Sequence, residues 1–182
     1  FFRPLGSDSK TNAGWNPHEM FFDELCEWQE HHLGLYGALT TGMGARRQPL
    51  RVVICTAGDD TSDIWQEEDD FAVKVLESVI TGQIIDDSYF AFIARIDDER
   101  ACDLCDGSDS TCMCKGTGIL PPDDPLDESC WPKAQPNLGV TVPLEYYREQ
   151  ANEAKHKPTA LYDFIRYQCN RKVTSSIKAI TP

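Results

Sequence analysis

Phe21-Phe22-Asp23-Glu24 joins the end of an apolar run to two adjacent carboxylates. We predict that residues 20–22 form a buried strand with the acids at its carboxyl end, where ligand sites form in parallel α/β sheets. In a nucleotide-hydrolysing α/β protein, Asp23 would hold the water shell of Mg²⁺, and Glu24 would orient or deprotonate the attacking water. The alternative is a solvated strand end without a catalytic role, because an acid pair after a short apolar run is a weak motif.

A second strand is predicted at residues 50–55, which are rich in β-branched side chains. It ends at Thr56-Ala57-Gly58, where the Thr56 hydroxyl could sense a γ-phosphate and Gly58 would let the backbone bend. The alternative is an ordinary turn in which Thr61 or Ser62 caps the following helix.

The remaining elements are predicted from hydrophobic spacing and from glycine and proline positions. An apolar run at residues 89–96 predicts a third strand, buried on both faces as a central parallel strand would be. The alternation of strand and helix predicts an α/β fold with a covered parallel sheet. Helices are expected at residues 33–39, 63–81, 144–155 and 160–170.

The helix expected at residues 63–81 carries apolar side chains at helical spacing, and Gly82 marks its end. We expect this stripe to pack in the core rather than to bind a ligand. It consists of Ile64, Phe71, Val75 and Val79.

Several stretches of the sequence, in one order, are similar to a single family of proteins. Together they resemble the central part of the large terminase subunit of tailed bacteriophages, the ATP-driven motor and nuclease that packages DNA into procapsids. The resemblance covers most of the chain outside residues 100–122 and implies a partial P-loop-type parallel sheet with flanking helices. The similar stretches are residues 4–10, 16–18, 23–25, 38–50, 56–58, 86–93, 131–140 and 145–150.

The resemblance implies a role for each motif. Asp23 resembles the Walker B aspartate that serves Mg²⁺, and Glu24 resembles the catalytic glutamate. Thr56-Ala57-Gly58 resembles the coupling motif that links hydrolysis to movement and contacts the nucleotide. Two positions depart from the family pattern. Cys55 replaces the first of two threonines in the coupling motif, and Cys26 stands where a histidine is common.

Arg46 and Arg47 lie in a glycine-rich turn between the two motifs. A guanidinium at Arg46 could stabilise transition-state charge on a phosphate, in its own subunit or in a neighbour's. The alternative is a loop arginine that pairs with one of the many acids of this chain.

The resemblance also predicts how the chain is divided. We expect residues 1–96 to be the C-terminal part of an ATPase domain and residues 97–125 to be a Cys-rich insertion. Residues 126–182 would be a helical region that leads toward the nuclease domain, with the nuclease acids beyond Pro182. The sequence contains no Gly-x-x-x-x-Gly-Lys-Ser/Thr segment. We therefore expect a fragment that is inactive alone.

In the intact protein the resemblance implies ATP and Mg²⁺ as cofactors. It implies double-stranded DNA, the phage portal protein and a small terminase subunit as partners of a homo-oligomeric ring. The expected location is the host cytoplasm and the procapsid, with no membrane, since no apolar run approaches the roughly 20 residues of a membrane helix. The net charge of −13 argues against a protein that coats DNA through bulk charge.

The insertion contains four cysteines within a short polar segment: Cys102, Cys105, Cys112 and Cys114. Cys102-x-x-Cys105 has the spacing of a zinc knuckle, and Cys114-x-Gly-x-Gly repeats half of that pattern, which resembles the Cys-rich zinc modules of the DnaJ type. Cys112-x-Cys114 departs from it by one residue. Zn²⁺ is the favoured interpretation, and free thiols or redox pairing are the alternatives.

The other cysteines are expected to be buried hydrophobic side chains, with Cys130 in a packing segment. His31 and His32 are interpreted as surface residues, because they lack a metal-ligand spacing. A second function class therefore stays open beside the motor. The chain could be a non-enzymatic, zinc-stabilised interaction module or a decayed prophage remnant.

Overall fold

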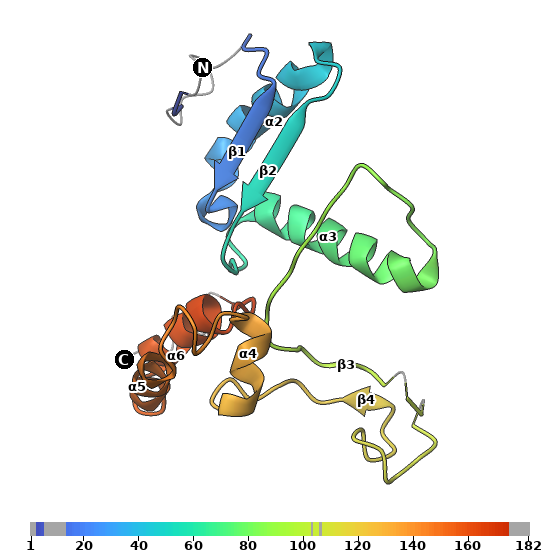
Figure 1. Ribbon diagram of the computed structural model, residues 1–182, viewed down its shortest axis with the longest axis vertical. Coiled ribbons are helices and arrows are strands. Elements are labelled where there is room, and N and C mark those ends of the chain that lie inside the picture. Colours follow the sequence, from blue (N-terminus) through green and yellow to red (C-terminus); the bar gives the residue numbers. More distant parts are fainter. Residues whose placement is uncertain (1–2, 6–13, 103, 106, 175–182) are drawn as a thin grey trace. The chain divides into compact units, whose positions relative to one another are not determined.

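The computed structural model describes residues 3–5, 14–102, 104–105 and 107–174 (Figure 1). It divides into two compact units, residues 1–91 and 92–182. Most of the stretch 4–10 and the last residues of the C-terminal region, 175–182, lie outside the described residues. Within the described part, no helix has both the length and the apolar character that crossing a membrane requires.

The first unit is built on two parallel strands, β1 (Glu19–Asp23) and β2 (Leu50–Ile54), which confirms both strand predictions. Phe21 pairs with Val52 in the register. Met20 and Phe22 point into the core, whereas Phe21 on the opposite face is 52% exposed. The expected covering is therefore found on one face of this sheet.

Helix α2 (Leu33–Gly42) and helix α3 (Asp63–Thr81) supply the rest of this core, and both were predicted. The observed bounds of α3 equal the predicted ones, because the residues that start and end this helix lie next to it in the sequence. The Ser62 side chain accepts from the Trp65 N–H, and Gly82 ends the helix with a left-handed φ of 68°. Three short 3₁₀ helices complete the unit: η1 (Leu25–Glu27), η2 (Glu30–His32) and η3 (Met43–Ala45).

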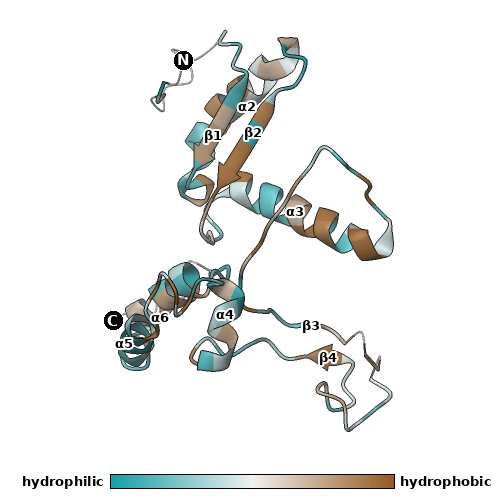
Figure 2. Ribbon diagram, in the orientation of Figure 1, coloured by the Kyte–Doolittle hydropathy of each residue, from teal (hydrophilic) through white to brown (hydrophobic). Residues whose placement is uncertain are grey.

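The predicted stripe of α3 is only partly correct. Ile64 and Val75 are buried, but Phe71 is 38% exposed and packs edge-on against the Tyr89 ring. Val79 is 84% exposed, at the apolar last turns of the helix visible in Figure 2. The helix extends beyond the residues that pack against the sheet, so spacing alone misassigns its last turns.

The third strand predicted at residues 89–96 is wrong. This segment is extended but forms no ladder with any strand that the structure describes. Phe90 and Phe92 are 88% and 74% exposed. Strand propensity reports fit to a half-buried pleated surface, and such a surface requires a neighbouring strand edge. The segment also crosses the division between the two units, which follows Ala91.

The second unit has a helical core. Trp131, Tyr147 and Phe164 stack edge-on or tilted with ring centroids 5.6–6.1 Å apart, and Ile96 is fully buried among them. The expected helices at the C-terminal end are confirmed, with the second one beginning two residues early at a proline. The elements are η4 (Glu128–Cys130), α4 (Trp131–Ala134), α5 (Leu144–Ala154), α6 (Pro158–Asp163) and the π-helical η5 (Phe164–Gln168).

A two-residue antiparallel pair, β3 (Arg100–Ala101) and β4 (Ile119–Leu120), closes the Cys-rich segment at its base.

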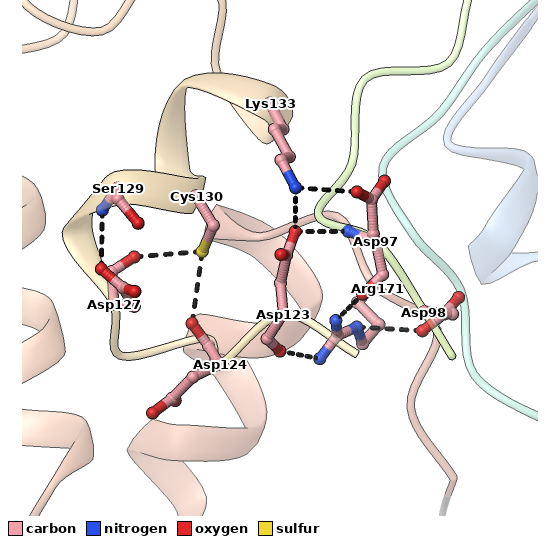
Figure 3. A network of polar contacts seen from close by, with 9 residues as sticks. All are labelled: Asp97, Asp98, Asp123, Asp124, Asp127, Ser129, Cys130, Lys133 and Arg171. Carbon is pink, nitrogen blue, oxygen red and sulfur yellow. Dashed lines mark hydrogen bonds and ion pairs between the residues drawn. The ribbon is translucent and has the colours of Figure 1, made fainter. Parts of the chain in front are cut away.

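In the second unit, ion pairs join segments distant in sequence (Figure 3). Lys133 Nζ lies 2.7 Å from carboxylate oxygens of both Asp97 and Asp123. These contacts raise the pKa of Lys133, with Asp123 as the larger cause.

Candidate functional site

The acid pair lies at the carboxyl end of β1, as predicted. Asp23 is the last residue of the strand and pairs with Ile54. The Glu24 N–H donates to the Ile54 carbonyl at 2.9 Å, and the chain then turns through a left-handed φ of 50° at Glu24. A non-glycine residue in this region costs about 1–2 kcal/mol. The strained backbone therefore lies at the second carboxylate of the pair, directly after the strand.

Thr56 follows β2, so its side chain reaches the same edge of the sheet. Its Oγ1 donates to Glu24 Oε2 at 3.0 Å. Both carboxylates are exposed. The structure therefore brings together three of the predicted site residues, Asp23, Glu24 and Thr56, at a solvent-accessible edge.

Ala57 and Gly58 are buried beneath this edge. A Cβ at Gly58 would lie 2.4 Å from Cε3 of Trp65. The glycine is therefore required for close approach of an indole rather than for the bend we predicted. Trp65 belongs to α3, so this contact places the helix directly under Thr56-Ala57-Gly58.

Ser62 also ties α3 to the acid pair. It is completely buried, and its Oγ donates to the Leu25 carbonyl at 3.3 Å. The same hydroxyl accepts the helix-capping bond from Trp65 N. This confirms the predicted cap and shows that one side chain connects the helix start to the turn after Glu24.

Cys26 and Cys55 lie in the same turn. The Cys26 N–H donates to Cys55 Sγ at 3.0 Å, and Cys26 Sγ donates to Glu24 Oε2 at 3.3 Å. A side-chain hydrogen bond between the two thiols lowers the pKa of Cys26 and raises the pKa of Cys55, whereas the Cys26 N–H acts in the opposite direction on Cys55. Cys26 is buried as predicted, whereas Cys55 is only half-buried, and both cysteines make polar contacts.

Arg46 lies elsewhere in the unit. It precedes β2, whereas the acid pair follows β1, so the five-residue strand, roughly 16 Å long, separates the two ends. Its guanidinium donates from Nε to the Asn16 carbonyl at 3.1 Å and lines a cleft of about 830 Å³. Asp23 and Glu24 are not among the residues lining that cleft. The structure therefore does not bring Arg46 to Glu24 of its own chain.

One hydrogen-bond network in the first unit was not predicted from the sequence. Arg51 donates to the Tyr36 hydroxyl at 2.7 Å and to both Glu68 carboxylate oxygens at 2.9 and 3.2 Å, and Tyr36 donates to Glu68. Burial and this hydrogen bond raise the pKa of Tyr36. Arg51 pairs in register with the buried Met20, and this register could not be read from the residue types alone.

The four cysteines of the insertion converge. Their Sγ atoms all lie within 4.8 Å of one another, and the Cys102–Cys112 and Cys102–Cys105 separations are 3.6 and 3.7 Å. A tetrahedral Zn²⁺ site with bonds of about 2.3 Å has sulfur separations near 3.8 Å. The Cys105–Cys114 separation is shorter, at 3.2 Å, so the cluster has the donor set of a Zn²⁺ site and approximately its spacing.

The backbone of this segment also supports thiolates. The Cys105 thiol and the N–H groups of Gly118 and Gly116 lower the pKa of Cys114 to about 6. Gly107 has a φ of 82°, and a Cβ there would lie 3.0 Å from Gly118 N. The turns at Gly107 and Gly118 therefore pack against each other.

Cys130 and Cys169 lie in the core of the second unit, apart from this cluster, as predicted. His32 is partly exposed and makes a local contact. Its Nδ1 accepts from the Gln29 N–H at 3.1 Å, so it caps η2.

Two family models match separate parts of the chain. The model described as the terminase large subunit ATPase domain matches residues 1–74, and the model described as the terminase large subunit endonuclease domain matches residues 120–181. The first match lies within the predicted ATPase part, and the second overlaps the predicted 126–182 region. Both leave out the four clustered cysteines.

One individual protein and one solved structure are also similar to this chain. Protein YmfN of Escherichia coli (strain K12) is 30% identical over 148 residues, which are 81% of this chain and 26% of that protein. The crystal structure of the HK97 bacteriophage large terminase covers 87% of this chain with a TM-score of 0.57. At 18% identity, that likeness shows the fold alone. The chain spans 26% of the length of each of these two proteins.

Proposed function

This chain belongs to the family of terminase large subunits, and from that premise we propose that it supplies the acid pair and coupling threonine of an ATP-driven motor. The motor would package double-stranded DNA into phage procapsids. The observation that carries the proposal is the Thr56–Glu24 hydrogen bond, which joins the two motifs at one edge of a parallel sheet. Ligand sites form at this edge in α/β folds.

Each residue has a distinct role in the proposed reaction. Mg²⁺ and ATP supply the electrophilic phosphate and its charge neutralisation when bound. Asp23 holds the water shell of the ion, and Glu24 accepts a proton from the attacking water. Thr56 holds the Glu24 carboxylate in place and transmits its movement to β2. Ala57 and Gly58 let Trp65 of α3 follow that movement.

Arg46 is proposed to act on the nucleotide of a neighbouring subunit. Its place at the amino end of β2 suits contact outside its own chain, and a guanidinium can stabilise transition-state charge in trans. This role implies a homo-oligomeric ring. The proposed setting is the host cytoplasm, at the portal protein of a procapsid, together with a small terminase subunit.

The insertion is proposed to bind one Zn²⁺ through Cys102, Cys105, Cys112 and Cys114. The metal would order the segment locally. A polar loop without a hydrophobic core loses conformational entropy when it folds, and the free energy of metal binding would offset that loss. This cluster also keeps a second function possible for the chain, that of a zinc-stabilised interaction module.

The test is ATP turnover by an intact large subunit that carries this segment with Glu24→Gln. We expect a loss of at least 100-fold, because general-base catalysis contributes about 10² to 10⁴, while ATP binding is retained. Glu27→Gln, an exposed acid in the same turn, serves as the matched control and keeps full activity. Turnover in Glu24→Gln equal to that of the control would refute the assignment.

A further inference from the structure

Two cysteines lie in contact with each other beside Glu24. Cys26 and Cys55 are 29 residues apart in sequence, yet the Cys26 N–H donates to Cys55 Sγ at 3.0 Å. They flank Glu24 and Thr56, the two residues that join the motifs.

A third donor completes the group. The carboxylate of Glu24 and the two sulfurs all lie within 4.8 Å of one another. Cys26 Sγ is 3.3 Å from Glu24 Oε2. Zn–S and Zn–O bonds of about 2.3 and 2.0 Å require donor separations near 3.5 Å. Small side-chain rotations would therefore bring the three donors onto one ion.

We propose that Glu24, Cys26 and Cys55 form a second metal site, for a thiophilic divalent cation such as Zn²⁺. A site with two sulfurs and one carboxylate binds such an ion in preference to Mg²⁺. The N–H of Cys26 that points at Cys55 Sγ stabilises the thiolate, as outer hydrogen bonds do in metal sites. Both thiols release their protons to solvent on binding.

The burial of the donors sets the direction of access. Cys26 is 2% exposed, whereas Glu24 is exposed, so the ion enters from the carboxylate side. The fourth position faces solvent and takes a water molecule, because three protein ligands leave a tetrahedral site open.

The consequence for the motor rests on the proposed function, although binding itself does not. An ion held by Glu24 occupies the carboxylate that would accept the proton from water. It also ties the turn after β1 to the end of β2 through Cys26 and Cys55. A thiophilic cation would therefore stop hydrolysis without displacing nucleotide.

The experiment is a Co²⁺ titration of the reduced chain, followed by the thiolate-to-cobalt absorption. We expect about two equivalents in the unaltered chain, one in the insertion and one at the new site. Cys55→Thr, which restores the family residue, should reduce this to about one. Glu24→Gln should weaken the second equivalent at least tenfold, and because Glu24 is exposed this change spares the fold. Cys169→Ser is the matched control for loss of a buried thiol outside both sites.

The Cys102→Ser/Cys105→Ser variant separates the two sites, since it should retain the equivalent that Cys55→Thr removes. A single equivalent in the unaltered chain, or a second one that survives Cys55→Thr, would overturn the proposal. Neither outcome depends on ATP turnover, so the motor assignment is tested independently.

Discussion

The Thr56 hydroxyl donates to the Glu24 carboxylate at 3.0 Å, although the residues lie 32 positions apart. The parallel pairing of β1 and β2 produces this contact, because it brings the residues that follow both strands to one edge. The bond links the acid that would activate water to the strand that would respond to hydrolysis.

Replacing Thr56 by Val removes this bond while keeping the shape of the side chain. We expect the free energy of unfolding to fall by about 1 kcal/mol or less, because water replaces the donor at an exposed carboxylate. Urea denaturation of this variant beside Thr56→Ser, which keeps the hydroxyl, measures the difference. A loss of several kcal/mol in Thr56→Val alone would show that the contact is structural rather than functional.

Gly58→Ala should be destabilising in proportion to the overlap with Trp65. The added Cβ would lie 2.4 Å from an indole carbon, and overpacking of this kind costs about 1–3 kcal/mol. Gly44→Ala is the matched control, since a Cβ there meets nothing within 4 Å. If Trp65→Leu restores part of the stability lost in Gly58→Ala, the indole is the cause; additive losses would contradict this.

Local signals predicted the strands and helices that carry the site. β1, β2 and α3 each combine an apolar pattern with an end signal, such as Ser62 before α3 and Gly82 after it. Residues 89–96 have the apolar pattern of a strand, but they pair with no strand in the described part of the structure. Whether a neighbouring edge exists is a property of the fold, and the sequence of one segment does not contain it.

Contacts across the strands could not be predicted residue by residue. The Cys26–Cys55 contact and the Arg51–Tyr36–Glu68 network depend on register, which residue type alone leaves open. The position of Arg46 was predictable in principle. In parallel strands, residues before one strand lie at the opposite edge from residues after its neighbour.

The zinc proposed for the insertion should depend on the clustered cysteines. We expect elemental mass spectrometry to find zinc in the purified chain, and the Cys102→Ser/Cys105→Ser variant to lose about one equivalent. Cys130→Ser, which alters a buried thiol in the helical core, should keep it. An unchanged zinc content in the double variant would exclude the cluster as a zinc site.

Tyr36 should make the stability of the first unit fall at high pH. Burial and the bond to Glu68 raise its folded-state pKa above the value near 10 of an unfolded tyrosine. Its contribution is complete below pH 10 and is lost as the pH rises toward the folded pKa, since the unfolded state then binds fewer protons. Relative to Tyr36→Phe, the unaltered chain should lose less than about 1 kcal/mol between pH 8 and pH 10.5.

Comparing the unaltered chain with Tyr36→Phe removes the effect of the other tyrosines on the pH dependence of stability. Glu68→Gln extends the test, because it removes a carboxylate that raises the Tyr36 pKa and leaves Arg51 without its charged partner. Tyrosinate absorbance should then develop at lower pH for one tyrosine, and the loss of stability should begin at the same lower pH. Identical titrations with and without the Glu68 charge would show that burial alone sets this pKa.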